Sequence, residues 1–405
     1  MVPNGWKSYQ LSELCAKPIS YGIVQTGENI EDGISCLRVV DLSNEKMNPN
    51  EMIKTSHEIN QAYKKTILED NEIVMALRGD VGLVRLIDAN LVGANITRGL
   101  ARISAKKGII HPEYLLWELR SPRFRADLIR RVGGSALQEI SLSELRKINT
   151  LVPSLNEQKK IAQILSTWDQ AISVTEKLLE NSQQQKKALM QQLLTGKQRL
   201  LDENGVRFSG DWGKIKLGNL IVQHSEKTEI NDQYPVLTSS RKGLFFQKDY
   251  YNGRDIASDD TTGYNVVPYG YFTYRHMSDD LVFSFNINNL CEKGIVSTLY
   301  PVFKAREELV IPGLLRLILN EGLAFKKFSL EQKQGGSRTY MYLSKLKELK
   351  LMIPPMKEQK KIIEILSIAH GGIENLQKKL DCLKQEKKVL MQQLLTGKKR
   401  VKVAA

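Results

Sequence analysis

The stretch KKALMQQLLTGKQR at residues 186–199 returns almost unchanged as KKVLMQQLLTGKKR at residues 387–400. Aligned without gaps, residues 153–197 and 354–398 are identical at 24 of 45 positions. Chance does not produce a repeat of this length and identity. It therefore divides the chain into two related halves, each with a globular region of roughly 150 residues followed by a repeat segment.

Each repeat carries apolar residues at alternating spacings of four and three, which predicts a heptad seam along a long helix. In the first repeat the helix is expected from about residue 156 to 195. Gly196 and Gly397 stand where a C′ glycine ends a helix. The second repeat contains Gly371 and Gly372, which leave open whether that helix is interrupted.

Two seams in one chain pair most simply with each other. A parallel pair would require the second globular region to carry the chain back along a helix of about 60 Å. A compact domain of that size is only about 40 Å across, so an antiparallel pair is predicted. Lys186 and Lys387 fall on the seams, where they weaken the apolar contact but could fix its register.

The globular regions are rich in short, β-branched or alternating runs separated by Gly, Asn and Asp turns, followed by a helical stretch. The sequence therefore predicts an α+β fold with two strand-rich domains, two long antiparallel coiled-coil helices and an internal pseudo-two-fold repeat. The expected boundaries are residues 1–152 and 201–353 for the two domains, 153–200 for the central helix, and 354–405 for the distal helix with a basic tail.

The net charge of +14 favours a polyanionic partner, for which nucleic acid is the commonest choice. The repeat segments, residues 156–200 and 357–405, carry +10 of that charge. Solvated helix faces with a basic tail would explain the same lysines. No apolar run is long enough for a membrane span, and the N-terminus resembles no signal peptide, so a cytoplasmic protein without a membrane partner is expected.

Signals of catalysis are missing from the sequence. The LLTGK segment lacks the upstream glycine of a phosphate-binding loop. The SDD triplets at residues 258–260 and 278–280 could hold Mg²⁺, but turn chemistry explains them more simply. The four cysteines and five histidines are dispersed, so no metal site is expected. The chain is therefore predicted to have no catalytic residues and to be no enzyme itself.

Several motifs together resemble the DNA specificity (S) subunit of type I restriction-modification systems. They are the W-x4-L at Trp6 and Trp212, the P-x-x-x-E-Q-x-x-I at residues 153–161 and 354–362, and the repeated LMQQLLTGK. The resemblance covers essentially the whole chain. It implies that each domain is a target-recognition domain that reads one half of a split double-stranded DNA site, while the helices set the separation of the halves.

The resemblance also implies partners and cofactors. Two methyltransferase (M) subunits, which use S-adenosylmethionine, would dock on the S subunit, and restriction (R) subunits, which use ATP and Mg²⁺, would complete the complex. No cofactor is expected in this chain. Because the repeat is identical on nearly all faces, the sequence also favours two equivalent docking surfaces for two copies of one partner. The predicted interface residues are Gln191, Gln192, Leu193, Leu194, Gln392, Gln393, Leu394 and Leu395.

Groove readout of DNA favours Arg or Lys on guanine and Asn or Gln on adenine, delivered from loops. The candidates in loop-like contexts are Gln25, Arg78, Arg98 and Ser135 in the first domain, and Arg241, Lys242, Tyr274, Arg275, Ser337 and Arg338 in the second. A surface ion pair or a turn is the alternative role for each. For the whole chain, the alternatives are a non-catalytic scaffold with two protein-binding domains and a coiled-coil spacer, or a fused enzyme of unusual motif.

Overall fold

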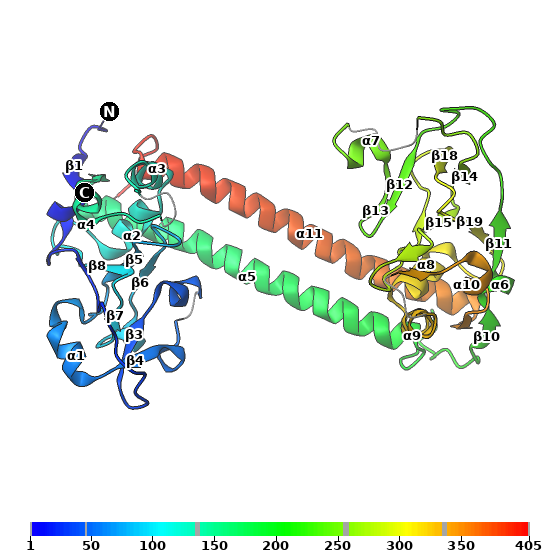
Figure 1. Ribbon diagram of the computed structural model, residues 1–405, viewed down its shortest axis with the longest axis horizontal. Coiled ribbons are helices and arrows are strands. Elements are labelled where there is room, and N and C mark those ends of the chain that lie inside the picture. The colour runs from blue at the N-terminus through cyan, green and yellow to red at the C-terminus, as the bar shows by residue number, and fades with distance from the viewer. Residues whose placement is uncertain (1, 45–46, 134–137, 254–258, 334–337, 404–405) are drawn as a thin grey trace. The chain divides into compact units, whose positions relative to one another are not determined.

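The computed structural model describes residues 2–44, 47–133, 138–253, 259–333 and 338–403 (Figure 1). The chain forms two compact units. Unit 1 comprises residues 1–177 and 378–405, and unit 2 comprises residues 178–377. Each unit thus contains part of both long helices, α5 (Leu155–Leu194) and α11 (Met356–Leu395), which are green and orange to red in Figure 1.

Both long helices have 40 residues, and α11 runs without interruption through Gly371 and Gly372. The two glycines have no backbone dihedral in the left-handed region, and a Cβ added to either would meet nothing within 4 Å. The helix therefore continues through both residues despite the lower helix propensity of glycine. The open question about this segment is thereby answered.

The seam prediction is confirmed, because every predicted seam position is buried or half-buried while most of its neighbours are exposed. In unit 1, Lys387 pairs with Asp169, and Lys384 Nζ lies 2.7 Å from Glu176 Oε1. In unit 2, Lys186 Nζ lies 3.2 Å from His370 Nδ1. In unit 1, the partner numbers fall along α11 as they rise along α5, so the pairing there is antiparallel, as predicted.

Unit 1 is built on a four-stranded antiparallel sheet whose central strands are buried on both faces. One face, through Ile73 and Met75, packs against the helices that follow the sheet and against the ends of α5 and α11. The opposite face, through Val74 and Ala76, packs under a three-stranded sheet and the loops around it. This alternation follows from the two-residue period of a strand.

The strands in the described part of unit 1 pair in three sheets. The orders are β2-β8-β5-β6 (Ser20–Tyr21, Leu100–Ile103, Ile73–Ala76, Val84–Leu86), β4-β3-β7 (Ile53–Thr55, Ile34–Leu37, Asn95–Ile96) and β1-β9 (Lys7–Gln10, Asn149–Val152). The shorter α-helices are α1 (His57–Ala62), α2 (Pro112–Arg120), α3 (Pro122–Arg130) and α4 (Leu142–Arg146). Among the described residues, 3₁₀ helices occupy Leu11–Leu14, Val39–Ser43, Pro49–Glu51, Lys64–Thr66 and Ala89–Leu91.

Unit 2 repeats this plan. It has its own four-stranded sheet, a pair of helices, and a small apolar core beside its main one. Its sheets are β11-β19-β15-β17 (Ile221–His224, Val302–Ala305, Phe272–Thr273, Asn286–Ile287), β12-β13 (Leu237–Ser240, Gly243–Phe246), β14-β18 (Asn265–Pro268, Lys293–Val296), β16-β20 (Met277–Ser278, Thr339–Tyr340) and β10-β21 (Gly213–Lys216, Lys350–Ile353). The shorter helices are α6 (Leu217–Leu220), α7 (Gln247–Tyr250), α8 (Pro312–Glu321), α9 (Leu323–Glu331) and α10 (Leu343–Leu346). The predicted α+β class is confirmed in both units.

The glutamine of the repeated E-Q dipeptide joins the first turn of each long helix to its unit by hydrogen bonds. Gln158 donates through Nε2 to the carbonyls of Ile109 and Pro153, at 3.0 and 2.9 Å, and its Oε1 accepts from the amide of His111 at 2.7 Å. Gln359 repeats all three bonds in unit 2 with Leu309, Pro354 and Ile311. Because both glutamines are buried, these bonds satisfy backbone groups that water cannot reach.

Candidate nucleic-acid interface

The three described candidates of unit 1 lie on loops that the fold brings together. The amide of Arg98 donates to the carbonyl of Ile23 at 2.8 Å, which places the loop of Gln25 beside that of Arg98. Arg78 follows β5, and a Cβ added at Gly99 would lie 3.2 Å from Arg78 Nε. Gln25 and Arg98 are exposed and Arg78 is half-buried. The loops therefore meet at one edge of the four-stranded sheet.

Gly22 allows the loops of Gln25 and Arg98 to approach each other closely. A Cβ at Gly22 would lie 1.8 Å from the carbonyl oxygen of Ile96, a distance that no side chain tolerates. Without it, Ile23 forms a parallel bridge with Thr97, and the two loops run next to each other. The glycine between the β2 strand and the Gln25 loop is thus required for the close approach of the candidate side chains.

In unit 2, three of the candidate arginines converge on the turn at residues 278–280. Arg241 Nη2 donates to both carboxylate oxygens of Asp280 at 2.7 Å, and Arg338 Nε donates to Asp279 Oδ1 at 2.9 Å. Arg275, which is exposed, lines the same groove of about 250 Å³ as Arg241 and Asp279. Segments separated by up to about 100 residues thus bring their charged side chains to one place.

The hairpin that carries Arg241 and Lys242 is held by its own polar groups. Lys242 donates its amide to Ser240 Oγ at 3.1 Å, and Ser240 Oγ donates to the carbonyl of Gly243 at 3.1 Å. Asn286 Nδ2 donates to the carbonyl of Ser240 at 2.9 Å, which ties the turn to β17. Both basic side chains are exposed at the tip.

The SDD turn of unit 2 behaves as turn chemistry predicts. Asp280 Oδ1 accepts from Ser278 Oγ at 3.0 Å and from the amide of Val282 at 3.2 Å. The hydrogen bond from Arg241 is the main reason that the pKa of the Asp280 carboxyl lies below its ordinary value. In the other triplet, Asp260 accepts from the amide of Thr262 at 2.8 Å. Among the described residues, no cluster of His, Cys, Asp or Glu could hold a metal ion.

Tyr274 requires a correction. Its side chain is 0% exposed, packs against Phe285 in the core of unit 2, and donates its hydroxyl to the carbonyl of Met341 at 2.7 Å. It has no surface with which to contact DNA, because the strand end that carries it turns this side chain inward. Two further candidates, Ser135 and Ser337, lie outside the described residues.

A pair of exposed tyrosines next to Arg338 was missed at the sequence level. Tyr342 stacks on His276 with ring centroids 5.0 Å apart, and Tyr340 stacks on Tyr342 at 5.9 Å and 11°. With Arg338 and Lys345 they line a groove of about 510 Å³. Aromatic faces beside basic groups are typical of surfaces that contact nucleic acid. The alternation TYMY before the α10 helix was the available signal.

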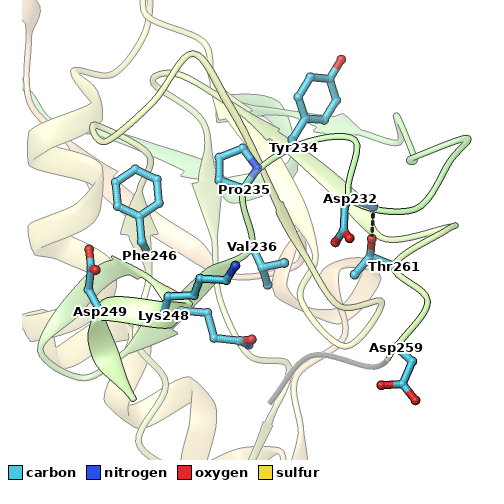
Figure 2. Close-up of a pocket in the computed structure, with 10 residues that line it drawn as sticks. Asp232, Tyr234, Pro235, Val236, Phe246, Lys248, Asp249, Asp259 and Thr261 are labelled. Carbon is cyan, nitrogen blue, oxygen red and sulfur yellow. Dashed lines mark hydrogen bonds between the residues drawn. The ribbon is translucent and has the colours of Figure 1, made fainter. Parts of the chain in front are cut away.

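A groove lined by three aspartates lies elsewhere in unit 2 (Figure 2). Asp232, Asp249 and Asp259 line it together with the aromatic rings of Tyr234 and Phe246, and Lys248 is the basic residue of the lining. In Figure 2, the amide of Asp232 is bonded to Thr261 Oγ1, at 2.8 Å. Three carboxylates repel phosphate groups, so this groove of about 740 Å³ is no candidate for DNA.

The predicted docking residues divide into two groups. Gln191, Gln192 and Gln392 are exposed. The docking prediction is wrong for three leucines, which are at most 1% exposed. Leu193 packs into the core of unit 2, and Leu394 and Leu395 pack into the core of unit 1. The two remaining predicted residues, Leu194 and Gln393, are half-buried. Packing of each helix end against an equivalent core thus explains much of the identity in the repeat.

These features match one family of proteins. The type I restriction modification DNA specificity domain matches twice, at residues 3–182 and 202–385, so that both halves of the chain are covered. The chain therefore belongs to the family of type I restriction-modification specificity subunits.

Individual relatives agree with this membership. The specificity subunit of the Escherichia coli type I restriction enzyme EcoBI is 31% identical over 163 residues, which are 40% of this chain and 34% of that protein. The match thus spans about a third of the E. coli relative. The specificity subunit of MjaVIII from Methanocaldococcus jannaschii is 25% identical over 368 residues, 84% of this chain and 81% of that one.

Solved structures show the same fold. The HsdS subunit from Thermoanaerobacter tengcongensis superposes with a TM-score of 0.53 at 16% identity, and the type I S subunit from M. genitalium with 0.55 at 15%. Each comparison covers 98% of both chains.

In the part of this chain that the structure describes, no helix is both long and apolar enough to cross a membrane.

Proposed function

We propose that this chain is the DNA-recognition subunit of a type I restriction-modification complex, and that each unit reads one half of a bipartite site. The observation that carries this proposal is the equivalence of the two candidate surfaces. The amide of Ile140 donates to the carbonyl of Leu77 in unit 1, and the amide of Met341 donates to that of His276 in unit 2. In each unit this bond joins the segment before a short helix, α4 or α10, to the chain beside a candidate arginine, Arg78 or Arg275.

The long helices have two roles in this proposal. Since α5 and α11 both run from one unit into the other, their length sets the spacing between the half-sites. Their exposed glutamines, Gln191 and Gln192 near the end of α5 and Gln392 near the end of α11, form part of two equivalent docking surfaces for methyltransferase subunits.

Chemistry then belongs to the partners. The methyltransferase subunits supply S-adenosylmethionine chemistry, and restriction subunits supply ATP- and Mg²⁺-dependent cleavage. The chain itself contributes sequence recognition and assembly, with no cofactor of its own.

The test is reconstitution of the full chain with its methyltransferase partner, followed by mapping of the methylated sites. We expect a two-part recognition sequence, two methyltransferases per chain by native mass spectrometry, and no methyl transfer by the chain alone. DNA affinity of the complex should fall linearly with salt on a log-log plot, because released counterions drive phosphate contacts. A complex that binds proteins but shows salt-independent, sequence-independent DNA binding would instead indicate a scaffold.

Changing the exposed glutamines tests the docking surfaces. Gln191→Glu with Gln192→Glu should lower the stoichiometry from two partners to one, since the surface on α11 is unchanged. Gln392→Glu should weaken binding at the other surface. A matched control is Gln184→Glu, an exposed residue of α5 outside the repeated LMQQLLTGK segment.

A further inference from the structure

The aspartates of the turn at residues 278–280 each hold an arginine from a different loop. Arg241 comes from the β12-β13 turn and Arg338 from the segment before β20, while Asp279 and Asp280 are neighbours in the chain. Arg338 and Asp279 are 54% and 68% exposed at their side chains. Exposed pairs of this kind stabilise a protein by only about 0–1 kcal/mol, so stability does not explain why two of them share one turn.

The turn holds one of its two carboxylates by hydrogen bonds of its own. Asp280 accepts from Ser278 Oγ and from the amide of Val282. Leu281 follows with φ of 66°, in the left-handed region that costs a leucine roughly 1–2 kcal/mol. The Asp280 carboxylate is therefore held in a defined orientation for Arg241, while Asp279 is held through its hydrogen bond with Arg338.

The donors that remain on the arginines suit a base edge. Within the described part of the chain, Arg338 makes its bond to protein through Nε alone, which leaves its two terminal nitrogens as a fork. Arg241 binds both carboxylate oxygens of Asp280 through Nη2, which leaves it separate donors on Nε and Nη1 that can each contact one acceptor of a base. A guanidinium fork with two free N–H groups matches O6 and N7 of guanine in the major groove, which is the commonest specific contact to DNA.

The charges argue against a phosphate site. The two carboxylates offset the charges of Arg241 and Arg338, so that Arg275 supplies the remaining positive charge at this turn, and the carboxylates repel a phosphate oxygen at short range. A base edge is neutral and is not repelled in this way. Arginines that serve to bind the backbone would gain from the absence of these aspartates, whereas arginines that read bases gain from being held still.

We propose that Arg338 and Arg241 are the guanine-reading residues of unit 2, and that Asp279 and Asp280 position them. This rests on the proposed function, and it deepens it. The half-site read by unit 2 then contains guanines, on either strand, and the stringency at those base pairs depends on the two arginines.

The experiment uses the full chain assembled with its methyltransferase subunits. Sites methylated by the wild type, Arg338→Ala and Arg241→Ala are mapped on genomic DNA, and affinities are measured for the mapped site and for single-base variants. We expect each alanine variant to lose about 5- to 150-fold in affinity for the mapped site and to accept other bases at one guanine-containing pair. Affinity for unrelated DNA should change by less than about twofold, because phosphate contacts remain.

Three further variants complete the design. Arg338→Lys should not restore stringency, because an ammonium group cannot form the fork. Asp279→Asn keeps the arginine and should relax stringency at the same base pair only. Arg306→Ala is the matched control, since Arg306 is 45% exposed and lies 4.0 Å from Glu308, itself 67% exposed, and its loss should leave the recognised sequence unchanged.

The outcomes separate this inference from the proposed function. A wild-type complex without any bipartite site would overturn the proposed function. A bipartite site that stays equally stringent in Arg338→Ala and Arg241→Ala, or a half-site of unit 2 without guanine, would overturn the inference alone. A uniform loss of affinity for all DNA would identify the arginines as phosphate contacts and would also overturn it. Melting curves of each variant exclude unfolding as the cause.

Discussion

Arg199 donates two hydrogen bonds to the carboxylate of Glu358, from Nε at 2.7 Å and from Nη2 at 2.8 Å. The chain that leaves α5 is thereby fastened to the first turn of α11. Trp212 completes the cluster, because its Nε1 donates to the same carboxylate at 3.1 Å. Glu358 is buried, so these partners replace the hydrogen bonds that water would otherwise supply to its carboxylate.

Unit 1 contains the same arrangement. Arg400 donates to Glu157 from Nε at 2.6 Å and from Nη2 at 2.8 Å, and its guanidinium lies 5.9 Å from the centre of the Trp6 ring. Gly196 and Gly397 make the turn that leads to each arginine, with φ of 69° and 67°, as the C′ prediction requires. The repeated residues therefore include one buried-glutamate ion pair in each unit, Arg199–Glu358 and Arg400–Glu157, which we call the clasp.

Removal of the arginine should destabilise unit 2 more than unit 1. The Arg199 side chain is 20% exposed and that of Arg400 is 49% exposed. Arg199→Ala leaves a buried carboxylate without its cation, which costs roughly 3–5 kcal/mol, and the cost of Arg400→Ala should be smaller because water reaches that site. Hydrogen exchange of the core peptides of each unit measures both effects. Equal protection in wild type and Arg199→Ala would show that the clasp does not stabilise the unit.

Alanine at Gly371 and Gly372 should stabilise the protein. Both positions are helical, and an added Cβ meets nothing within 4 Å. Each substitution should therefore add about 1 kcal/mol through helix propensity, visible as a rise of roughly 2–4 °C in melting temperature. Gly196→Ala is the matched control and should lower it, because its φ of 69° is strained for alanine. A lower melting temperature for the Gly371 variant would mean that the helix needs the glycine.

The long helices could be predicted because a heptad seam repeats over many turns and depends on local spacing alone. The partners of Glu157 and Glu358 could not, since Arg400 and Arg199 are 243 and 159 residues away and the repeat says only that both residues recur. Long-range pairing is set by the fold around it. The clasp was therefore found in the structure.

Prediction of the candidate site from the sequence was limited in the same way. Alternation in the stretch around Tyr274 predicts a strand with two faces, but the pattern leaves undecided which face meets the core. In LMQQLLTGK, the identity beyond the seam positions was attributed to docking because a single seam covers only one face of a helix, whereas the core of each unit covers a second face. The candidate arginines could be predicted, because loops with Arg beside turn residues are visible in the sequence.

Stability of unit 1 should decline as pH rises above the ordinary range of a glutamate. Burial raises the pKa of the Glu118 carboxyl, and the charge of Arg123 opposes this only in part. The folded state then binds the proton more tightly than the unfolded chain, so this contribution is complete below the ordinary pKa of 4.5 and is lost as pH rises through the folded pKa. Glu118→Gln should remove the dependence in urea unfolding followed by tryptophan fluorescence.

Glu144→Gln provides the control with opposite sign. Hydrogen bonds from Lys147 and Arg131 lower the pKa of the Glu144 carboxyl. Its contribution is therefore present above the ordinary pKa and is lost as pH falls through the folded one. If wild type and Glu118→Gln showed the same change in unfolding midpoint between pH 4.5 and 7.5, burial of Glu118 would not control the titration of unit 1.

Matched insertions in the long helices test whether they set the spacing of the half-sites. Seven residues added after Lys177 in α5 and seven after Gln377 in α11, at the boundaries of the two units, keep the heptad seam in phase. At 1.5 Å per residue they lengthen both helices by about 10.5 Å, which corresponds to roughly three base pairs at 3.4 Å each. The reader loops are unchanged, so the half-site sequences should stay the same while their spacing grows by about three base pairs in the mapped methylation sites. Insertion into α5 alone should slip the seam and abolish assembly, and an unchanged spacing after matched insertion would show that another part of the complex sets the distance.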